Sequence, residues 1–184
     1  MRFFILVISM DIKLILPAPE YEAQVMEFRA EMLADGEGFD GCAGLDKAQS
    51  YAEWCDNHTL MKKLYGENCS PSDVFLAVRE SDNKVVGIID YRYVLSDFLL
   101  KYGGHTGYTV RRTERRKGYG SEMLRLLIEK AKARGEKRLL VTCDKDNEAS
   151  RRTILKCFAR LENEVADEAG LGKCGVIQRY WIEL

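Results

Sequence analysis

Residues 115–120 form a basic, glycine-containing turn that joins a strand-type segment to a strongly amphipathic helix. The turn reads RRKGYG, and in the helix that follows it Met123, Leu127 and Ala131 share one apolar face. The first turn of a helix leaves its backbone N–H groups without intrahelical partners, and the helix dipole is positive at that end. The glycines let the backbone approach a ligand because no Cβ is in the way. The sequence therefore predicts a phosphate-binding site at this junction.

Cationic side chains crowd the same turn. They are Arg111, Arg112, Arg115, Arg116 and Lys117. Cations at a helix N-terminus oppose the dipole at a cost of about 0.3–1 kcal/mol each, and a bound anion would reverse that cost. The glycine spacing matches neither the dinucleotide-binding fingerprint nor the P-loop. We therefore expect a different phosphate-bearing ligand.

The wider segment supplies the candidate. Arg115-x-x-Gly118-x-Gly120 lies between a strand-type segment at 107–110 and an apolar strand at 139–143, and Asn147-x-x-Ser150 then opens another helix. In this ordered set the chain resembles the GNAT superfamily of N-acetyltransferases, whose acetyl-CoA signature is Gln or Arg, two residues, Gly, one residue, and Gly or Ala. The resemblance implies acetyl-CoA as the acyl donor and no required metal.

Hydrophobic periodicity predicts an α/β fold. The expected order is a short strand at 13–16, helices at 20–33 and 48–65, strands at 74–79, 85–94 and 105–110, the helix after the basic turn, a strand at 138–143, a helix at 148–158, and strands near 161–165 and 176–182. This order matches a GNAT-like mixed, centrally splayed β-sheet flanked by helices. With no linker or repeat, residues 1–184 are expected to form one acetyltransferase domain.

The opening apolar run is too short to cross a membrane and is followed by no small-residue cleavage site. Two interpretations remain open for residues 1–9. Met10 is the native start and these residues are an extended start, which we favour, or they add a piece of strand.

Composition limits the function classes. The formal net charge of -1 gives the molecule no overall attraction for nucleic acid, so the basic turn is expected to be a local site. The six cysteines form no C-x-x-C pair, which favours reduced thiols and a cytoplasmic location. A metal site at Cys55, His58 and Cys69 is conceivable but disfavoured, because the spacing matches no metal-ligand pattern.

Within the resemblance, the donor site can be assigned residue by residue. The backbone of Tyr108 and Val110 would hold the pantetheine arm and the acetyl carbonyl. Backbone N–H groups from Arg116 to Ser121 would bind the diphosphate. The full set of expected donor-binding residues is Tyr108, Val110, Arg112, Arg115, Arg116, Lys117, Gly118, Tyr119, Gly120, Ser121, Asn147 and Ser150. Asn147 would also cap its helix, with Ser150 at the third helical position.

Catalytic groups are harder to assign. His105 stands at the position, two residues before Gly107, where the resemblance implies a Glu in many family members. It is a candidate general base for the amine, or else a strand-end histidine bonded to a carbonyl. The usual general acid of the family is a Tyr at the position of Ile154. In this chain the proton for the departing CoA thiolate would have to come from another tyrosine, such as Tyr108 or Tyr180, or from water.

The acceptor is left open. A cationic amine would be drawn to the acidic loop that contains Asp40, unless this loop is only solvated, and Arg92 could instead bind an acceptor carboxylate. An apolar segment at 94–102 makes a homodimer possible. We expect an N-acetyltransferase that moves acetyl directly to a primary amine of a small molecule or peptide. The rivals are a non-catalytic acyl-CoA-binding or sensing module and, less favoured, a nucleic-acid-binding domain.

Overall fold

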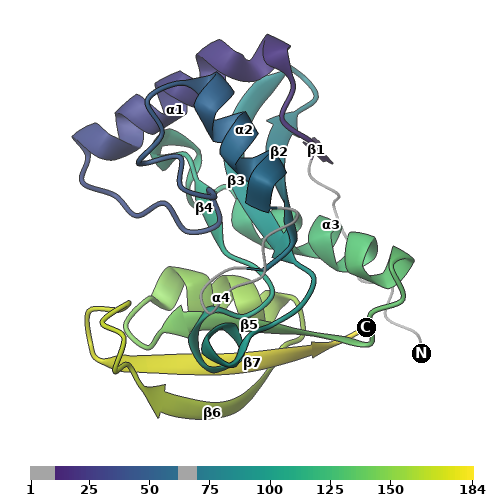
Figure 1. Ribbon diagram of the computed structural model, residues 1–184. Helices are drawn as coiled ribbons and strands as arrows, with labels where there is room; N and C mark the ends of the chain where they lie inside the picture. Colours follow the sequence, from purple (N-terminus) through teal and green to yellow (C-terminus); the bar gives the residue numbers. More distant parts are fainter. Residues whose placement is uncertain (1–10, 62–69) are drawn as a thin grey trace.

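The computed structural model describes residues 11–61 and 70–184 (Figure 1). The question of the native start lies outside these residues, and so does Cys69 of the disfavoured metal site. Within them, no helix is long and apolar enough to cross a membrane.

The first sheet is antiparallel throughout and has the order β1-β2-β3-β4. Its strands are β1 (Ile12–Ile15), β2 (Ser72–Arg79), β3 (Lys84–Arg92) and β4 (Tyr108–Val110). Successive residues of β2 point to opposite faces, so Phe75 belongs to one core cluster and Leu76 to the other. Both faces of the sheet are therefore buried.

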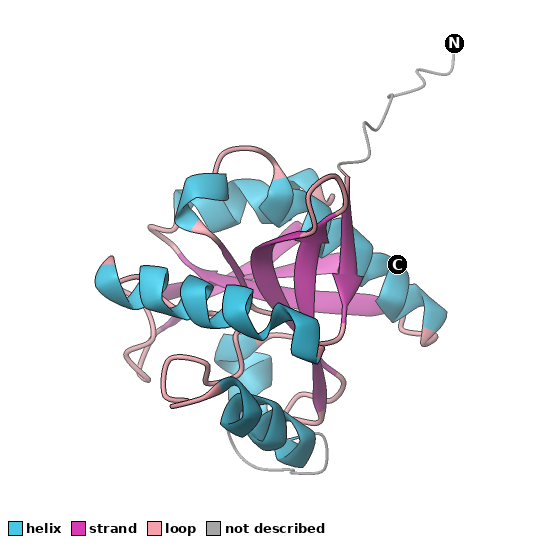
Figure 2. Cartoon of the chain, turned by 90° about the horizontal axis from the view of Figure 1, so that it is seen from above, coloured by secondary structure: helices cyan, strands magenta, loops and turns pink. Residues whose placement is uncertain are grey.

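Helices cover these two faces (Figure 2). The short 3-10 helix η1 (Pro19–Tyr21) leads into α1 (Glu22–Ala34), which packs with α2 (Tyr51–Met61) on one face. The amphipathic α3 (Tyr119–Ala133) packs on the other and buries the predicted apolar residues Met123, Leu127 and Ala131. The predicted helix at 48–65 is described over a narrower range, 51–61.

The second sheet has the order β5-β7-β6 and is also antiparallel. Its strands are β5 (Arg138–Asp144), β6 (Arg160–Ala166) and β7 (Val176–Glu183), and α4 (Glu148–Lys156) follows β5. The connection before β4 holds a π-helix, η2 (Leu99–Gly103), and the one after it a 3-10 turn, η3 (Arg112–Glu114).

The two sheets meet at a short seam. Thr106 and Val141 form an isolated parallel bridge, and the His105 amide donates to the Leu140 carbonyl at 2.8 Å. Beyond this seam, β4 pairs with β3 along one edge, and its other edge pairs with no strand among residues 11–61 and 70–184. The predicted central splay is therefore present.

The predicted strand at 105–110 is shortened to Tyr108–Val110. The cause is a side chain, because the Gly107 amide donates to Asp90 Oδ1 at 2.6 Å instead of to a strand carbonyl. The kink at Gly107 lies where β4 leaves the seam.

Candidate active site

The basic turn has the backbone shape expected of an anion site. Arg116 and Gly118 both have positive φ, 62° and 93°, and Gly118 is the N-cap of α3 without any side-chain cap. Within the described part of the chain, the backbone N–H groups from Arg116 to Ser121 donate to no protein acceptor. Unpaired N–H groups at the positive end of a 15-residue helix are suited to bind an anion.

Gly120 keeps this turn open without being required by packing. A Cβ at this position would lie 3.5 Å from Thr153 Oγ1 and 3.7 Å from Val110 Cγ2, which are ordinary contacts. The protein itself therefore has room for a small side chain here, whereas a long acidic side chain would compete with an anion.

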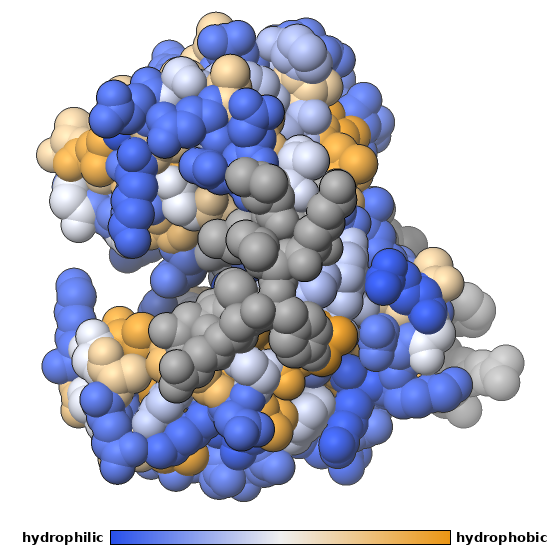
Figure 3. Space-filling model, viewed as in Figure 1, coloured by the Kyte–Doolittle hydropathy of each residue, from blue (hydrophilic) through white to orange (hydrophobic). Residues whose placement is uncertain are grey.

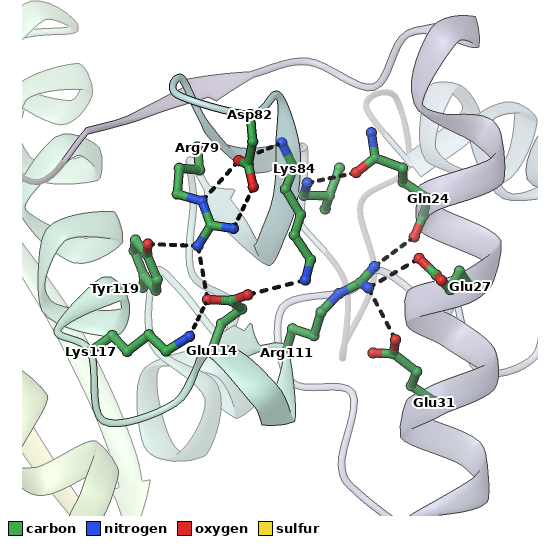
Figure 4. Close-up of polar contacts among 11 residues, drawn as sticks. Gln24, Glu27, Glu31, Arg79, Asp82, Lys84, Arg111, Glu114, Lys117 and Tyr119 are labelled. Carbon is green, nitrogen blue, oxygen red and sulfur yellow. Dashed lines mark hydrogen bonds and ion pairs between the residues drawn. The ribbon is translucent and has the colours of Figure 1, made fainter.

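The cationic side chains of the turn differ in the carboxylates with which they pair. Arg111 is buried, and its guanidinium bonds Glu27 at 3.1 Å and Glu31 at 3.0 Å on α1 (Figure 4). It anchors α1 to β4 rather than facing a ligand. Arg116 forms no ion pair among the residues that the structure describes.

The remaining cations of the turn pair with nearby carboxylates. Arg112 pairs with Asp35, and Arg115 donates to Glu37 at 2.9 Å and to the Val110 carbonyl at 3.2 Å. These arginines stay partly exposed beside the unpaired amides.

Lys117 pairs with a buried carboxylate. Its Nζ lies 2.8 Å from Glu114, which also accepts bonds from Arg79 at 3.0 Å and Lys84 at 3.1 Å (Figure 4). Burial raises the pKa of Glu114, but hydrogen bonds from Lys117, Lys84 and Arg79 outweigh it and lower the pKa to about 2. Tyr119 joins this cluster, because its hydroxyl accepts a bond from Arg79 at 3.0 Å. These two side chains tie the turn to Arg79 and Glu114, and their part in donor binding stays a prediction.

The free edge of β4 presents the predicted backbone groups. Arg111 N donates to the Val86 carbonyl, and Asp90 N donates to the Gly107 carbonyl, so odd-numbered residues face β3. Backbone groups alternate in direction along a strand. Tyr108 and Val110 therefore point their N–H and C=O groups towards the splay, as an added extended ligand requires.

The side chain of Tyr108 crosses the splay to α4. Its hydroxyl lies 2.9 Å from Ser150 Oγ, and Ser150 N donates to the Asn147 side chain at 3.0 Å. The predicted N-cap at Asn147 is thus confirmed. Burial raises the pKa of Tyr108 more than the Ser150 hydrogen bond lowers it, so the phenol stays protonated. Ile154, at the position of the family's acid, is buried in the core.

His105 has a role at the seam between the sheets. Its Nδ1 accepts the Leu140 amide at 2.8 Å, and burial lowers its pKa. A neutral imidazole that accepts at Nδ1 carries its proton on Nε2 and has no free lone pair for a substrate proton. The geometry therefore favours a structural histidine, as in the second interpretation above, with the bond coming from an amide rather than to a carbonyl.

The two predicted acceptor residues lie near each other and near β4. Arg92 pairs with buried Asp90 at 2.8 Å and donates to the carbonyls of Gly103 and Gly104, so its terminal nitrogens already have protein partners. Asp40 is exposed and has no such pairing among the described residues. The pKa of Asp40 is raised. Desolvation is the largest cause, and together with the Asp90 charge it outweighs the lowering by the Arg92 charge.

Asp90 was not singled out by sequence reasoning. The available signal is a charged residue at the end of the apolar run VVGIID, where a buried carboxylate needs partners.

Figure 3 shows a deep notch in the molecule. It opens at the left of the view, between the part that carries the α1–α2 connection and the part that carries α4 and the connection before β7. Its position between the two sheets agrees with the splay beside β4.

Two groups resemble metal sites. Asp144, Asp146 and Cys174 lie close enough to hold an ion, but the Asp144 carboxylate already accepts the amides of Asp146 and Cys174 and the Cys174 thiol. These contacts hold the loop before β7 against the end of β5. At the conceivable site around Cys55, the Nε2 atom of buried His58 accepts the Val74 amide at 3.0 Å.

Comparisons with known proteins agree with this geometry. A model of the acetyltransferase (GNAT) family matches residues 43–158. No curated protein is significantly similar in sequence to the chain.

Several solved structures share the fold. A RimL ribosomal L7/L12 alpha-N-protein acetyltransferase in complex with coenzyme A is 15% identical, with a TM-score of 0.71 and 96% of each chain covered. A ribosomal-protein-S5-alanine acetyltransferase from Vibrio fischeri is 16% identical, with a TM-score of 0.67, covering 94% of this chain and 93% of the other. The microcin C7 self-immunity acetyltransferase MccE, in complex with acetyl-CoA and AMP, is 17% identical, with a TM-score of 0.64 and 95% and 93% covered.

The family match includes β4, the basic turn and α3, and extends over more than half of the sequence. The chain therefore belongs to the acetyltransferase (GNAT) family.

Proposed function

We propose that this enzyme transfers the acetyl group of acetyl-CoA directly to a primary amine, with the donor bound along the splay beside β4. The observation that carries the proposal is the row of unpaired amides from Arg116 to Ser121 at the start of α3, next to the free edge of β4. A diphosphate fits the unpaired amides, and an extended pantetheine arm fits the free edge of β4. Similar structures contain coenzyme A or acetyl-CoA.

The reaction requires a nucleophile, a stabilised oxyanion and a proton for the leaving thiolate. The neutral amine attacks the acetyl carbonyl, and the amide of Tyr108 is the backbone donor placed to bond the carbonyl oxygen. The C–S bond then breaks, and the thiolate of CoA takes a proton from the Tyr108 hydroxyl, which Ser150 orients at 2.9 Å. The attacking nitrogen loses its extra proton to water or to a carboxylate such as Asp40, and the Tyr108 phenolate regains a proton from water. This arrangement supplies an acid despite Ile154.

For the acceptor we favour the α-amino group of a protein N-terminus. The support is the set of similar structures described as acting on ribosomal proteins, namely the L7/L12 and S5-alanine acetyltransferases. A protonated α-amine is a cation of the kind that exposed Asp40 attracts. Acetyl-CoA and newly made ribosomal proteins occur together in the cytoplasm, where we place the reaction.

The donor site is tested with two substitutions at one position. Gly120→Glu introduces a carboxylate beside the unpaired amides and is expected to abolish CoA binding in calorimetry. Gly120→Ala is the matched control, since its methyl group meets only ordinary contacts, and is expected to bind CoA within about threefold of the unaltered protein. Equal affinity of both variants would place the donor elsewhere.

The transfer itself is tested by release of free thiol from acetyl-CoA. The panel contains peptides with free α-amino groups, the same peptides with blocked N-termini, polyamines and lysine side-chain mimics. Thiol release with the free peptides alone supports the proposal. CoA binding without thiol release from any amine would support the non-catalytic alternative.

A further inference from the structure

The acidic loop after α1 lies against the basic turn of the proposed donor site. Glu37 accepts a bond from Arg115 at 2.9 Å. Two residues earlier in the loop, Asp35 pairs with Arg112. The hydrogen bond from Arg115 lowers the pKa of Glu37, so this carboxylate is ionised at neutral pH. A negative group of the protein thus lies where a negative ligand is expected.

The other end of the loop is fixed on β4. The Thr109 hydroxyl donates to the Asp40 carbonyl at 2.8 Å, and the backbones of Gly41 and Gly107 touch so closely that a Cβ on Gly41 would lie 1.9 Å from the Gly107 oxygen. The loop is therefore anchored near the acetyl end of the splay. Its other half, around Glu37, is held to the turn mainly by partly exposed ion pairs.

Arg115 does not need Glu37 for its orientation. Its Nε donates separately to the Val110 carbonyl at 3.2 Å, which ties the guanidinium to the free edge of β4. The bond to Glu37 uses Nη1, one of the two terminal nitrogens through which an arginine binds a diphosphate in bidentate fashion.

We infer that Glu37 is an internal competitor for the donor diphosphate. In the free enzyme its carboxylate holds Nη1 of Arg115, and the diphosphate must displace it to bond the guanidinium through both terminal nitrogens. This inference rests on the proposed function, since it assumes that CoA binds at the start of α3. It makes Glu37 a determinant of donor affinity and links donor binding to the loop that carries Asp40.

The size of the effect follows from exposure. The side chains of Arg115 and Glu37 are 38% and 31% exposed, and pairs of this kind contribute about 0.2–1 kcal/mol. Removing the competing charge is therefore expected to tighten CoA binding about 1.5- to 5-fold. If Glu37 instead orients Arg115, its removal would weaken binding.

The test is a double-mutant cycle read by calorimetry with CoA. Glu37→Gln should lower Kd by about 1.5- to 5-fold, and Arg115→Gln should raise it. In the double variant, Glu37→Gln should give no gain, because the guanidinium for which the two anions compete is absent. Asp46→Asn is the control for loop charge, since Asp46 makes no ion pair among the described residues, and its Kd should stay unchanged.

The possible failures are distinguishable. Unaltered protein that binds no CoA would overturn the proposed function and this inference with it. If that protein binds CoA, an unchanged or weaker affinity of Glu37→Gln would overturn only the competition. A gain that persists in the Arg115→Gln background, or that Asp46→Asn reproduces, would do the same by showing a general charge effect.

Discussion

The ammonium group of Lys117 lies 2.8 Å from the carboxylate of Glu114. Glu114 is 3% exposed and joins Lys117 to Arg79 and Lys84 on the β2–β3 hairpin. The turn that presents the unpaired amides is therefore fixed to the first sheet by a buried carboxylate. A rigid turn keeps those amides in place before a ligand arrives, which reduces the ordering cost of binding.

Glu114→Gln is expected to lower the free energy of unfolding by about 2–4 kcal/mol, because it removes the charge of the buried carboxylate that pairs with Arg79, Lys84 and Lys117. The control is Glu129→Gln, which breaks an exposed pair with Lys132 and should cost less than about 1 kcal/mol. Urea unfolding at pH 7 measures both. Equal costs for the two variants would contradict the role of Glu114.

The same residue predicts a pH dependence. Its folded pKa of about 2 lies below the ordinary value of 4.5. The stabilisation is therefore fully present above about pH 4.5 and is lost as the pH falls towards 2. The stability difference between the unaltered protein and Glu114→Gln should shrink over this window. A difference that stays constant from pH 6 to pH 3 would show that Glu114 is not held ionised.

Tyr108→Phe is expected to lower kcat about 10- to 100-fold while KM for acetyl-CoA changes little, because it removes the proposed proton donor and keeps the backbone that binds the donor. Tyr180→Phe is the control. Its hydroxyl donates to buried Gln178 at 2.7 Å rather than to Ser150. Steady-state kinetics separate the two, and loss of kcat in Tyr180→Phe alone would assign the acid to Tyr180.

His105→Asn tests the general base. An asparagine oxygen can still accept the Leu140 amide, so we expect a small loss of stability and an unchanged shape of the profile of log kcat/KM against pH. The lowered pKa of His105 means that the imidazole is neutral at pH 7. Disappearance of the acidic limb of the profile in this variant would restore His105 as the base.

Local signals in the sequence predicted the parts of the site that depend on neighbouring residues. The turn before α3 and the cap formed by Asn147 are both set within a few residues, and both agree with the structure. The order of strands and helices followed from periodicity, which also identified the apolar face of α3. Resemblance to a family then supplied the splay.

The partners of the cations could not be predicted in this way. Arg111 pairs with Glu27 and Glu31, which lie 84 and 80 positions earlier in the chain, and Arg79 meets Glu114 at a separation of 35. Charge patterning along the sequence identifies such residues as charged but not which carboxylate each will meet. A run of basic residues therefore indicated more free positive charge than the folded turn presents.

Asp90 is the residue whose removal should show how far the splay depends on one side chain. It accepts the Gly107 amide at 2.6 Å and pairs with Arg92 at 2.8 Å, and it is buried. Asp90→Ala is expected to lower both stability and kcat, because it frees the kink that sets the direction of β4 and leaves Arg92 without its carboxylate. Asp90→Asn can still accept the Gly107 amide, so it should recover most of kcat even if the unpaired Arg92 keeps its stability low. The measurements are kcat with acetyl-CoA and the midpoint of thermal unfolding. If Asp90→Asn loses as much kcat as Asp90→Ala, the charge of Asp90 matters more than its bond to Gly107. The geometry of the kink would then not be what places Tyr108 for catalysis.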